Sequence, residues 1–142
     1  MLANKSGSVK NISRLMVFKI GGKAALPAPP PEADRVLDPP PLTATPQQVA
    51  QGAKQYGLFC STCHGDAAVS GGLNPDLRHS GALNDAKVWQ AIVHDGALKE
   101  NGMVAWSPVM SADQIETIRA YVIKRAIEDK ALQEKATQVA SR

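Results

Sequence analysis

The chain has 142 residues, of which 44% are hydrophobic and 20% are charged, a balance typical of a globular domain that argues against disorder throughout. Its formal net charge is +3 and its basic residues form no patch interleaved with aromatic residues, so nucleic-acid binding is not expected. No apolar run approaches the roughly 18 residues of a membrane-spanning helix, and two cysteines three positions apart cannot form a disulfide framework.

The first segment, residues 13–22, has the sequence SRLMVFKIGG and is expected to form a β-strand. Phe18 and Ile20 favour strands, and the glycines that follow would end one. Nothing else in the chain resembles a strand, and a single strand leaves its backbone groups unpaired. We therefore expect residues 1–24 to be the stub of a preceding domain whose sheet lies outside this chain. A flexible tail is the alternative.

Residues 25–44 contain seven prolines between positions 27 and 41. Proline lacks an N–H group and has a fixed φ, so this segment is expected to be an extended, semi-rigid linker with a reach on the order of 60 Å. Recognition of the prolines by a binding module is a less favoured alternative.

Residues 45–142 are expected to form an all-α domain that begins with a helix over 46–59. Thr45 and Gln48 have the spacing of a capping box, and a proline occupies the first helical position. This helix would deliver Cys60 at its end.

Two further helices are expected downstream. One begins after Asn84 or Asp85 and stops near Gly96. The other begins at Ser111, whose capping partner is Gln114. Its apolar stripe comprises Ile115, Ile118, Tyr121, Val122 and Ile123.

The segments that connect and follow these helices also carry information. Residues 65–83 and 97–110 are long for loops in a compact domain, and such loops are usually functional. The polar sequence after Ile127 predicts a frayed, solvated helix end.

Residues 60–64, CSTCH, carry the most specific pattern in the chain. A redox dithiol would need a βαβ context and a helix N-terminus that lowers the thiol pKa, but this pair follows a helix. A zinc site would need two more ligands, and the remaining histidines, His79 and His94, form no second pair. Both interpretations are disfavoured.

Attachment of haem c accounts for all five positions. Cys60 and Cys63 have the separation that two thioether bonds to the haem vinyl groups require, and His64 then lies under the iron as the proximal ligand. The porphyrin would also supply apolar bulk to a chain with only 4% aromatic residues. We therefore expect the haem-free chain to be largely unfolded.

The second axial ligand is expected to be Met103. It lies in the segment ENGMVAW, after Gly102, which lets the backbone come close to a ring, and before Trp106, which can pack on the haem edge. A methionine just before a helix cap commonly packs onto the helix instead. The competing candidates are Met110, at such a position, and the two histidines His79 and His94.

Ligation by His64 and Met103 would leave the iron six-coordinate, without a position for oxygen or substrate. Such a site suits one-electron transfer, so we expect no catalytic residues and disfavour a peroxidase-type enzyme.

The spacing of Gly52, Tyr56 and Cys60 resembles the class I cytochrome c family. In that family the N-terminal helix crosses the C-terminal helix with its glycine and aromatic residue at the contact, which here would face Ile118 and Tyr121. A helix-interior glycine costs up to ~1 kcal/mol relative to alanine, and a close helix crossing explains it. The resemblance implies a class I cytochrome c fold, with three main helices around a covalent haem.

The segment NPDLRHSGAL also resembles this family. The resemblance implies that Pro75 offers its carbonyl to the far nitrogen of His64, and Arg78 could pair with a haem propionate. A turn proline and a solvated arginine are the alternatives.

The closer resemblance is to the C-terminal cytochrome domain of type II quinohaemoprotein alcohol dehydrogenases. The similar stretches cover nearly the whole chain: RLMVFKIGG, the proline-rich linker, PDLR, VWQAIVHDGALKENGM and MSADQIETIRAYV. Val104 departs from the family, which often has proline after the methionine. The domain that bears pyrroloquinoline quinone (PQQ) is absent, so this chain alone cannot oxidise an alcohol.

The resemblance implies a periplasmic electron-transfer domain. Its one covalent haem c would accept electrons from PQQ in the partner dehydrogenase domain and pass them to a soluble acceptor, such as a copper protein or another cytochrome. A free-standing soluble carrier with a disordered tail is the alternative. The apolar run near Lys19 is too short for a secretory signal, which is consistent with a fragment of an exported parent protein.

Overall fold

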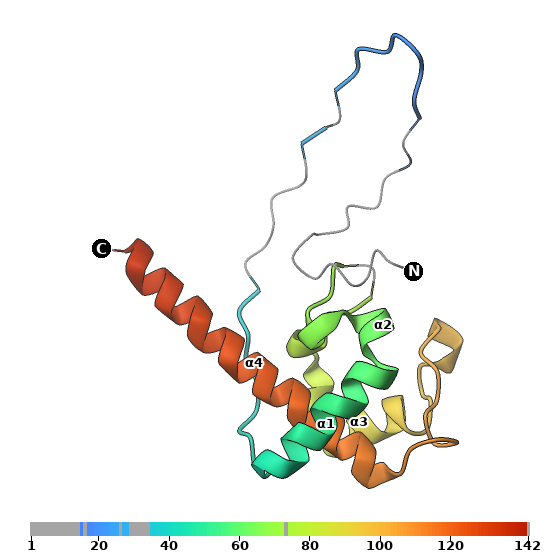
Figure 1. The fold of residues 1–142 in the computed structure, drawn as a ribbon, viewed down its shortest axis with the longest axis vertical. Helices are drawn as coiled ribbons and strands as arrows, with labels where there is room; N and C mark the ends of the chain where they lie inside the picture. Colours follow the sequence, from blue (N-terminus) through green and yellow to red (C-terminus); the bar gives the residue numbers. More distant parts are fainter. Residues whose placement is uncertain (1–14, 16, 26, 29–34, 73, 142) are drawn as a thin grey trace.

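The computed structural model describes residues 15, 17–25, 27–28, 35–72 and 74–141, and its folded part is helical (Figure 1). No β-strand occurs among these residues, which confirms the all-α prediction. The α-helices are α1 (Pro46–Phe59), α2 (Ser61–His64), α3 (Ala86–Val93) and α4 (Ala112–Ala140). Short 3₁₀ helices lie between them: η2 (Asp66–Ala68), η3 (Leu77–His79), η4 (Gly81–Asn84) and η5 (Lys99–Asn101).

The helices begin where their capping residues predict. Thr45 and Gln48 form a reciprocal capping box at α1, and Ser111 and Gln114 form another at α4. The side chain of Asp85 caps α3, which settles the choice between Asn84 and Asp85.

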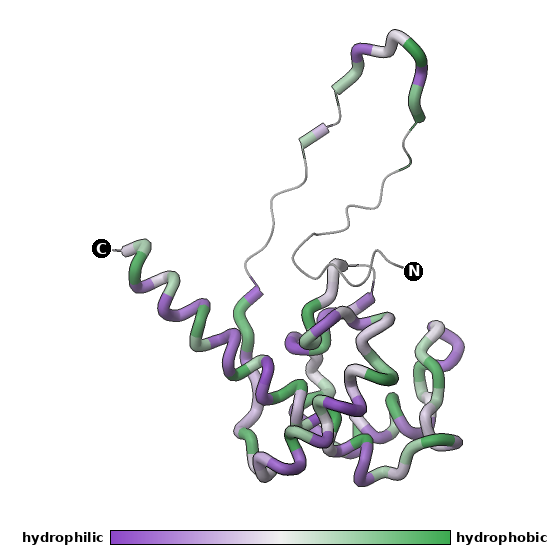
Figure 2. The backbone as a smooth tube through the Cα atoms, in the orientation of Figure 1, coloured by the Kyte–Doolittle hydropathy of each residue, from purple (hydrophilic) through white to green (hydrophobic). Residues whose placement is uncertain are grey.

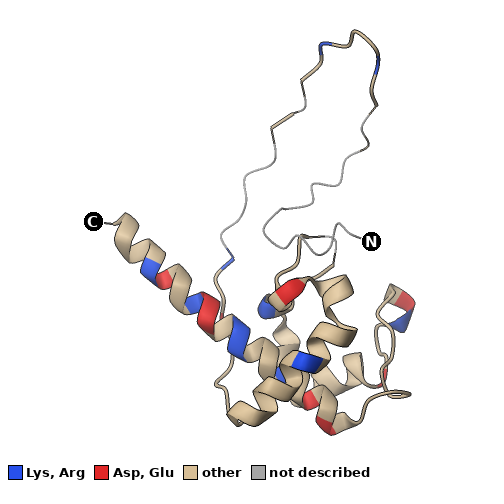
Figure 3. Ribbon diagram, viewed as in Figure 1, with Lys and Arg blue, Asp and Glu red and all other residues tan. Residues whose placement is uncertain are grey.

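The prediction that the chain frays after Ile127 is wrong, because α4 continues to Ala140. Residues 131–141 are exposed and mix hydrophilic with hydrophobic types (Figure 2). Alanine, glutamate, glutamine and lysine have high helix propensity, and charges of both signs follow one another along α4 (Figure 3). High helix propensity therefore sustains the exposed end of the helix without a packed face. The i,i+4 pair Lys124–Glu128 stabilises the turn just before that end.

The core lies where α1 crosses α4. A Cβ added to Gly52 would lie 1.9 Å from the carbonyl oxygen of Thr117 and 3.1 Å from the backbone nitrogen of Ile118. One turn further along α1, the rings of Tyr56 and Tyr121 are 5.2 Å apart. The predicted helix crossing and its reason for Gly52 are confirmed.

The core is completed by residues from α3 and from the loops. The Trp89 indole donates a hydrogen bond of 3.1 Å to the Ile115 carbonyl, which fixes α3 against α4. The buried cluster includes Tyr56, Leu83, Trp89, Val93, Met110, Ile115, Ile118 and Val122.

The strand predicted over residues 13–22 is not formed by its described residues, which are 15 and 17–22. Leu15, Val17, Phe18 and Ile20 are each at least 86% exposed and lie apart from the helices (Figure 1). A strand needs a partner for its hydrogen bonds, and no other described segment supplies one. Residues 13, 14 and 16 lie outside the described residues, as does most of the predicted stub 1–24.

The second half of the predicted linker is not a free spacer. Leu37 is completely buried, and Lys130 of α4 forms an ion pair of 3.6 Å with Asp38. The prediction of a free spacer rested on the stiffness of the proline backbone alone. Packing of the apolar Leu37 side chain on the domain contributes favourable free energy, which holds this part of the linker in place. The docked part of the linker therefore begins no later than Leu37.

Within the part of the chain that the structure describes, no helix combines the length and apolar character that a bilayer crossing requires.

Candidate functional site

The CSTCH motif lies at the sharp junction of α1 and α2. Cys60 is the C-cap of α1 and the N-cap of α2, and its carbonyl accepts hydrogen bonds from the backbone N–H groups of Cys63, at 3.1 Å, and His64, at 2.9 Å. Residues three apart in a helical turn lie on one side of it. Both thiols are free; Cys60 is buried and Cys63 is exposed.

The Cys60 thiol does not have the electrostatics of a redox-active cysteine. Burial raises the pKa of the Cys60 thiol to about 12, and the nearby Cys63 adds to the effect. A redox-active pair needs a depressed pKa, because the thiolate is the nucleophile. The environment of Cys60 therefore disfavours thiol chemistry.

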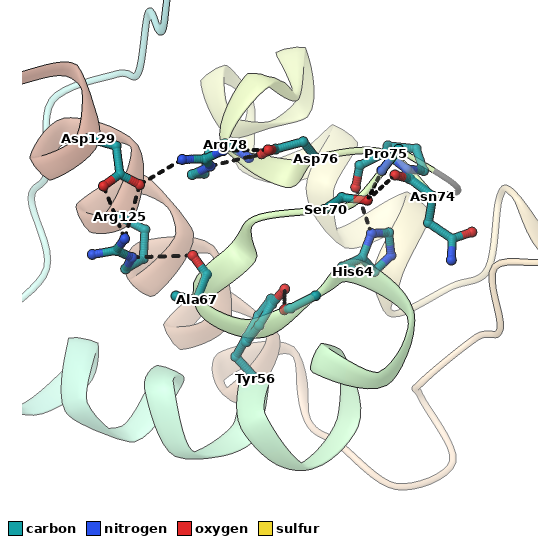
Figure 4. Close-up of polar contacts among 12 residues, drawn as sticks. Tyr56, His64, Ala67, Ser70, Asn74, Pro75, Asp76, Arg78, Arg125 and Asp129 are labelled. Atoms are coloured by element: carbon teal, nitrogen blue, oxygen red, sulfur yellow. Dashed lines mark hydrogen bonds and ion pairs between the residues drawn. The ribbon is translucent and has the colours of Figure 1, made fainter. Parts of the chain in front are cut away.

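The ring of His64 has a defined orientation and tautomer. It is 8% exposed, and its Nδ1 lies 3.0 Å from the carbonyl oxygen of Pro75 (Figure 4). A carbonyl can only accept a hydrogen bond, so Nδ1 carries a proton, and in the neutral imidazole Nε2 then has the lone pair. The contact that the resemblance implied between Pro75 and His64 is present. It orients the ring and leaves Nε2 as the nitrogen that could bind a metal.

Hydrogen bonds hold the chain on both sides of His64. The Tyr56 hydroxyl donates to the Gly65 carbonyl at 2.8 Å, and the Asn74 amide donates to the Cys63 carbonyl at 2.8 Å. Ser70 donates in turn to the Asn74 carbonyl at 2.5 Å. The sequence alone predicted no role for Ser70 or Asn74, and for Tyr56 it predicted only the ring contact with α4. The one signal that could have pointed to Asn74 is its position directly before Pro75 in the segment NPDLR.

Arg78 is not the solvated arginine of the alternative interpretation. Its side chain is only 15% exposed, and its guanidinium binds the carboxylates of Asp76 and Asp129. Burial acts to lower the pKa of Arg78, but the hydrogen bonds to Asp76 and Asp129 outweigh burial and raise it. The structure thus gives Arg78 two carboxylate partners within the protein, because α4 extends far enough to supply Asp129.

The two candidate methionines lie in different environments. Met110 is 4% exposed and belongs to the same buried cluster as Ile115, as expected of a residue that packs onto the helix that follows it. Met103 is only partly buried, and its backbone N–H donates to the Leu98 carbonyl at 3.2 Å. Among the described residues, no contact joins the sulfur of either methionine to His64. Met110 is part of the buried core, whereas Met103 packs against that core from a partly buried position.

The loop after Met103 is tied to the end of α3. The backbone N–H of Trp106 donates to the Val93 carbonyl at 3.0 Å, and its ring lies 5.3 Å from that of Phe59, next to Cys60. A Cβ added to Gly96 would lie 2.6 Å from the Ala105 side chain, so glycine also permits the close passage of this loop. Trp106 therefore lies near the end of α1 that carries the CSTCH motif.

The remaining histidines, His79 and His94, are both partly buried. His94 pairs with Asp95 at 2.6 Å, and burial lowers the pKa of His79. No group of three or more His, Cys, Asp or Glu side chains that could hold a bare metal ion occurs among the described residues.

Known proteins match this chain in sequence and fold. A family model described as cytochrome c oxidase, cbb3-type, subunit III matches residues 47–122, a little over half of the chain. Over 131 residues the chain is 46% identical to the quinohemoprotein alcohol dehydrogenase ADH IIB of Pseudomonas putida, a match that covers 90% of this chain and 19% of that protein.

Two further matches agree. The dehydrogenase subunit of the alcohol dehydrogenase (quinone) of Gluconobacter oxydans is 40% identical over 129 residues, which cover 89% of this chain and 17% of that subunit. The solved quinohemoprotein alcohol dehydrogenase ADHIIG of Pseudomonas putida HK5 matches with a TM-score of 0.61 and 37% identity, covering 76% of this chain and 15% of that one. The chain spans less than a fifth of the length of these relatives. The predicted fold and resemblance are confirmed.

Proposed function

This chain belongs to the cbb3-type cytochrome c domain family, and from that premise we propose that it accepts single electrons from the PQQ site of an alcohol dehydrogenase and passes them to an external acceptor. Family membership implies haem binding and electron transfer. We propose in addition that the haem is attached covalently, that His64 and Met103 are its iron ligands, and that electrons pass from PQQ to an external acceptor.

The single observation that carries the proposal is the hydrogen bond between His64 and Pro75. Because it leaves Nε2 as the free ring nitrogen, His64 fits the proximal position of a haem iron. Bound haem supplies one-electron redox chemistry at its iron. Cys60 and Cys63 lie one helical turn apart directly before His64, and they would form the two thioether bonds.

The surrounding residues also fit an apolar macrocycle. Leu77, Met103 and Trp106 pack against the core but are only partly buried, so a large apolar group bound against them would complete their burial. Met103 would supply the second axial ligand. If His64 and Met103 both hold the iron, the site would be suited to electron transfer and not to binding a substrate.

The donor is inferred from the relatives, whose names include quinohemoprotein and quinone alcohol dehydrogenases. The proline-rich linker is consistent with a haem domain tethered to its donor. Such a tether would keep the haem and the PQQ at high effective concentration. The docked end of this linker, at Leu37 and Asp38, joins the domain beside α4. We place the parent protein in the bacterial periplasm, as the resemblance implies.

Covalent attachment is tested by mass spectrometry of chain produced with haem c maturation. The denatured protein should carry the mass of one haem after extraction with acidified acetone, and the Cys60→Ala, Cys63→Ala double variant should carry none. Pigment that is extracted from the wild-type chain would contradict the proposal.

The donor is tested by mixing the oxidised holoprotein with an alcohol-reduced PQQ dehydrogenase that lacks its own cytochrome. The haem spectrum should become that of the reduced form at a rate that saturates with dehydrogenase concentration, and a PQQ-free dehydrogenase is the control. Slow reduction without saturation would favour a free-standing carrier.

A further inference from the structure

One carboxylate on α4 joins two segments that flank His64 (Figure 4). A side-chain oxygen of Asp129, Oδ2, accepts a hydrogen bond of 2.8 Å from Nη1 of Arg78. The same carboxylate accepts from Nη2 of Arg125, at 3.1 Å to Oδ1 and 3.0 Å to Oδ2. The Asp129 and Arg78 side chains are each 15% exposed, so these charge-assisted bonds are largely shielded from water.

The first segment reaches His64 through Arg78. The Nε and Nη2 atoms of Arg78 bind the two carboxylate oxygens of Asp76 as a fork, which fixes the plane of that carboxylate. Asp76 directly follows Pro75, and the carbonyl that accepts from His64 belongs to the peptide unit between them. The position of Arg78 therefore constrains the direction of the hydrogen bond to His64.

The second segment reaches His64 through Arg125. Its Nε donates to the carbonyl oxygen of Ala67 at 3.2 Å. Ala67 and Ala68 have φ values of +54° and +64°, a left-handed conformation that alanine rarely adopts. Such a conformation persists only where the surroundings hold it, and Ala67 lies three residues after His64.

We infer that Asp129 is a positioning residue for His64, acting through Arg78 and Arg125 to hold both segments in register with α4. Because hydrogen bonding to the distal ring nitrogen raises ligand basicity, Asp129 would thereby tune the iron ligand from another helix. This inference rests on the proposed function in so far as His64 is an iron ligand.

The rest of the fold does not depend on this carboxylate. The α1–α4 crossing depends on Gly52, and α3 is held to α4 by the Trp89 indole.

Both arginines would retain a carboxylate partner without Asp129. Arg78 would still bind Asp76, and Arg125 would still bind Glu128. The loop would lose its anchor to α4 while the helices stay packed.

The test compares proton exchange in the reduced holoprotein by NMR. In Asp129→Asn, the His64 Nδ1–H should exchange with solvent at least about tenfold faster than in the wild type, while the Trp89 Nε1–H should exchange at an unchanged rate. The midpoint potential should rise, because a less basic imidazole stabilises ferric iron less. Glu134→Gln removes the same charge from an exposed position of α4 and is the matched control; it should change neither exchange rate.

Equal acceleration of both protons would mean general destabilisation and would overturn the inference, as would unchanged exchange of the His64 proton. Asp129→Glu should restore slow exchange in part. Should Asp129→Asn fail to retain haem, Arg78→Lys is the second variant, since it keeps the charge but cannot bridge both carboxylates. A wild-type chain without covalent haem would instead count against the proposed function.

Discussion

The hydroxyl of Tyr56 donates a hydrogen bond of 2.8 Å to the carbonyl of Gly65, the residue directly after His64. The same ring packs against Tyr121 of α4. One side chain of α1 thus contributes to the helix crossing and holds the end of the CSTCH turn, so the fold and the site share a residue.

Tyr56→Phe should lower the free energy of unfolding of the holoprotein by about 1–3 kcal/mol, because the buried Gly65 carbonyl would lose its partner while the ring contact remains. Denaturant unfolding at constant pH measures the change. Tyr121→Phe, at a partly exposed ring, is the control and should have a smaller effect. Equal losses in both variants would show that the hydroxyl of Tyr56 has no special role.

Gly52→Ala should destabilise the holoprotein by about 3 kcal/mol or more, since the new methyl group would overlap the Thr117 backbone and force α1 away from α4. Gly57 lies on the same helix with no atom near an added Cβ, so Gly57→Ala should be neutral or stabilising by up to ~1 kcal/mol. Thermal and denaturant unfolding compare the two, and a tolerated alanine at 52 would contradict the close crossing.

Met103→Ala should abolish the weak near-infrared band that arises from sulfur ligation of ferric haem, with a small effect on folding. Met110→Ala should keep that band but cost about 2–5 kcal/mol of stability, because it leaves a cavity in the core. Absorption spectra and denaturant unfolding of both variants separate the roles. Retention of the band in Met103→Ala would move the ligand to Met110.

Removal of haem should unfold most of the chain, since Leu77, Met103 and Trp106 would lose the group proposed to complete their burial. Far-ultraviolet circular dichroism of the Cys60→Ala, Cys63→Ala variant produced without haem measures this. The exposed end of α4 can keep some residual helix. A haem-free chain with the full helical signal and cooperative melting would contradict the expectation.

Stability should fall in mildly acidic solution partly because of His79. Burial lowers its pKa in the folded protein, whereas the unfolded chain retains a pKa of about 6.5. The unfolded state therefore binds the proton more readily, and the stability present above pH ~6.5 is lost as the pH falls through the folded pKa. His79→Gln should show a smaller loss between about pH 7.5 and 5. An identical loss in both proteins would exclude His79 as a cause.

The sequence by itself determined the features that neighbouring residues encode. The capping boxes at Thr45 and Ser111 are complete within four residues, so the helix starts could be predicted. The CSTCH turn is equally local. The crossing at Gly52 could also be inferred, because a glycine inside a helix needs a reason and close approach supplies it.

The tertiary structure alone decided which distant groups meet. Arg78 binds Asp129, 51 positions away, and Arg125 reaches the Ala67 carbonyl, 58 positions away. An arginine has the same local pattern whether it faces a propionate, water or a carboxylate. Which partner it has depends on how far α4 extends and which of its faces meets the loop, and these follow from packing of the whole chain.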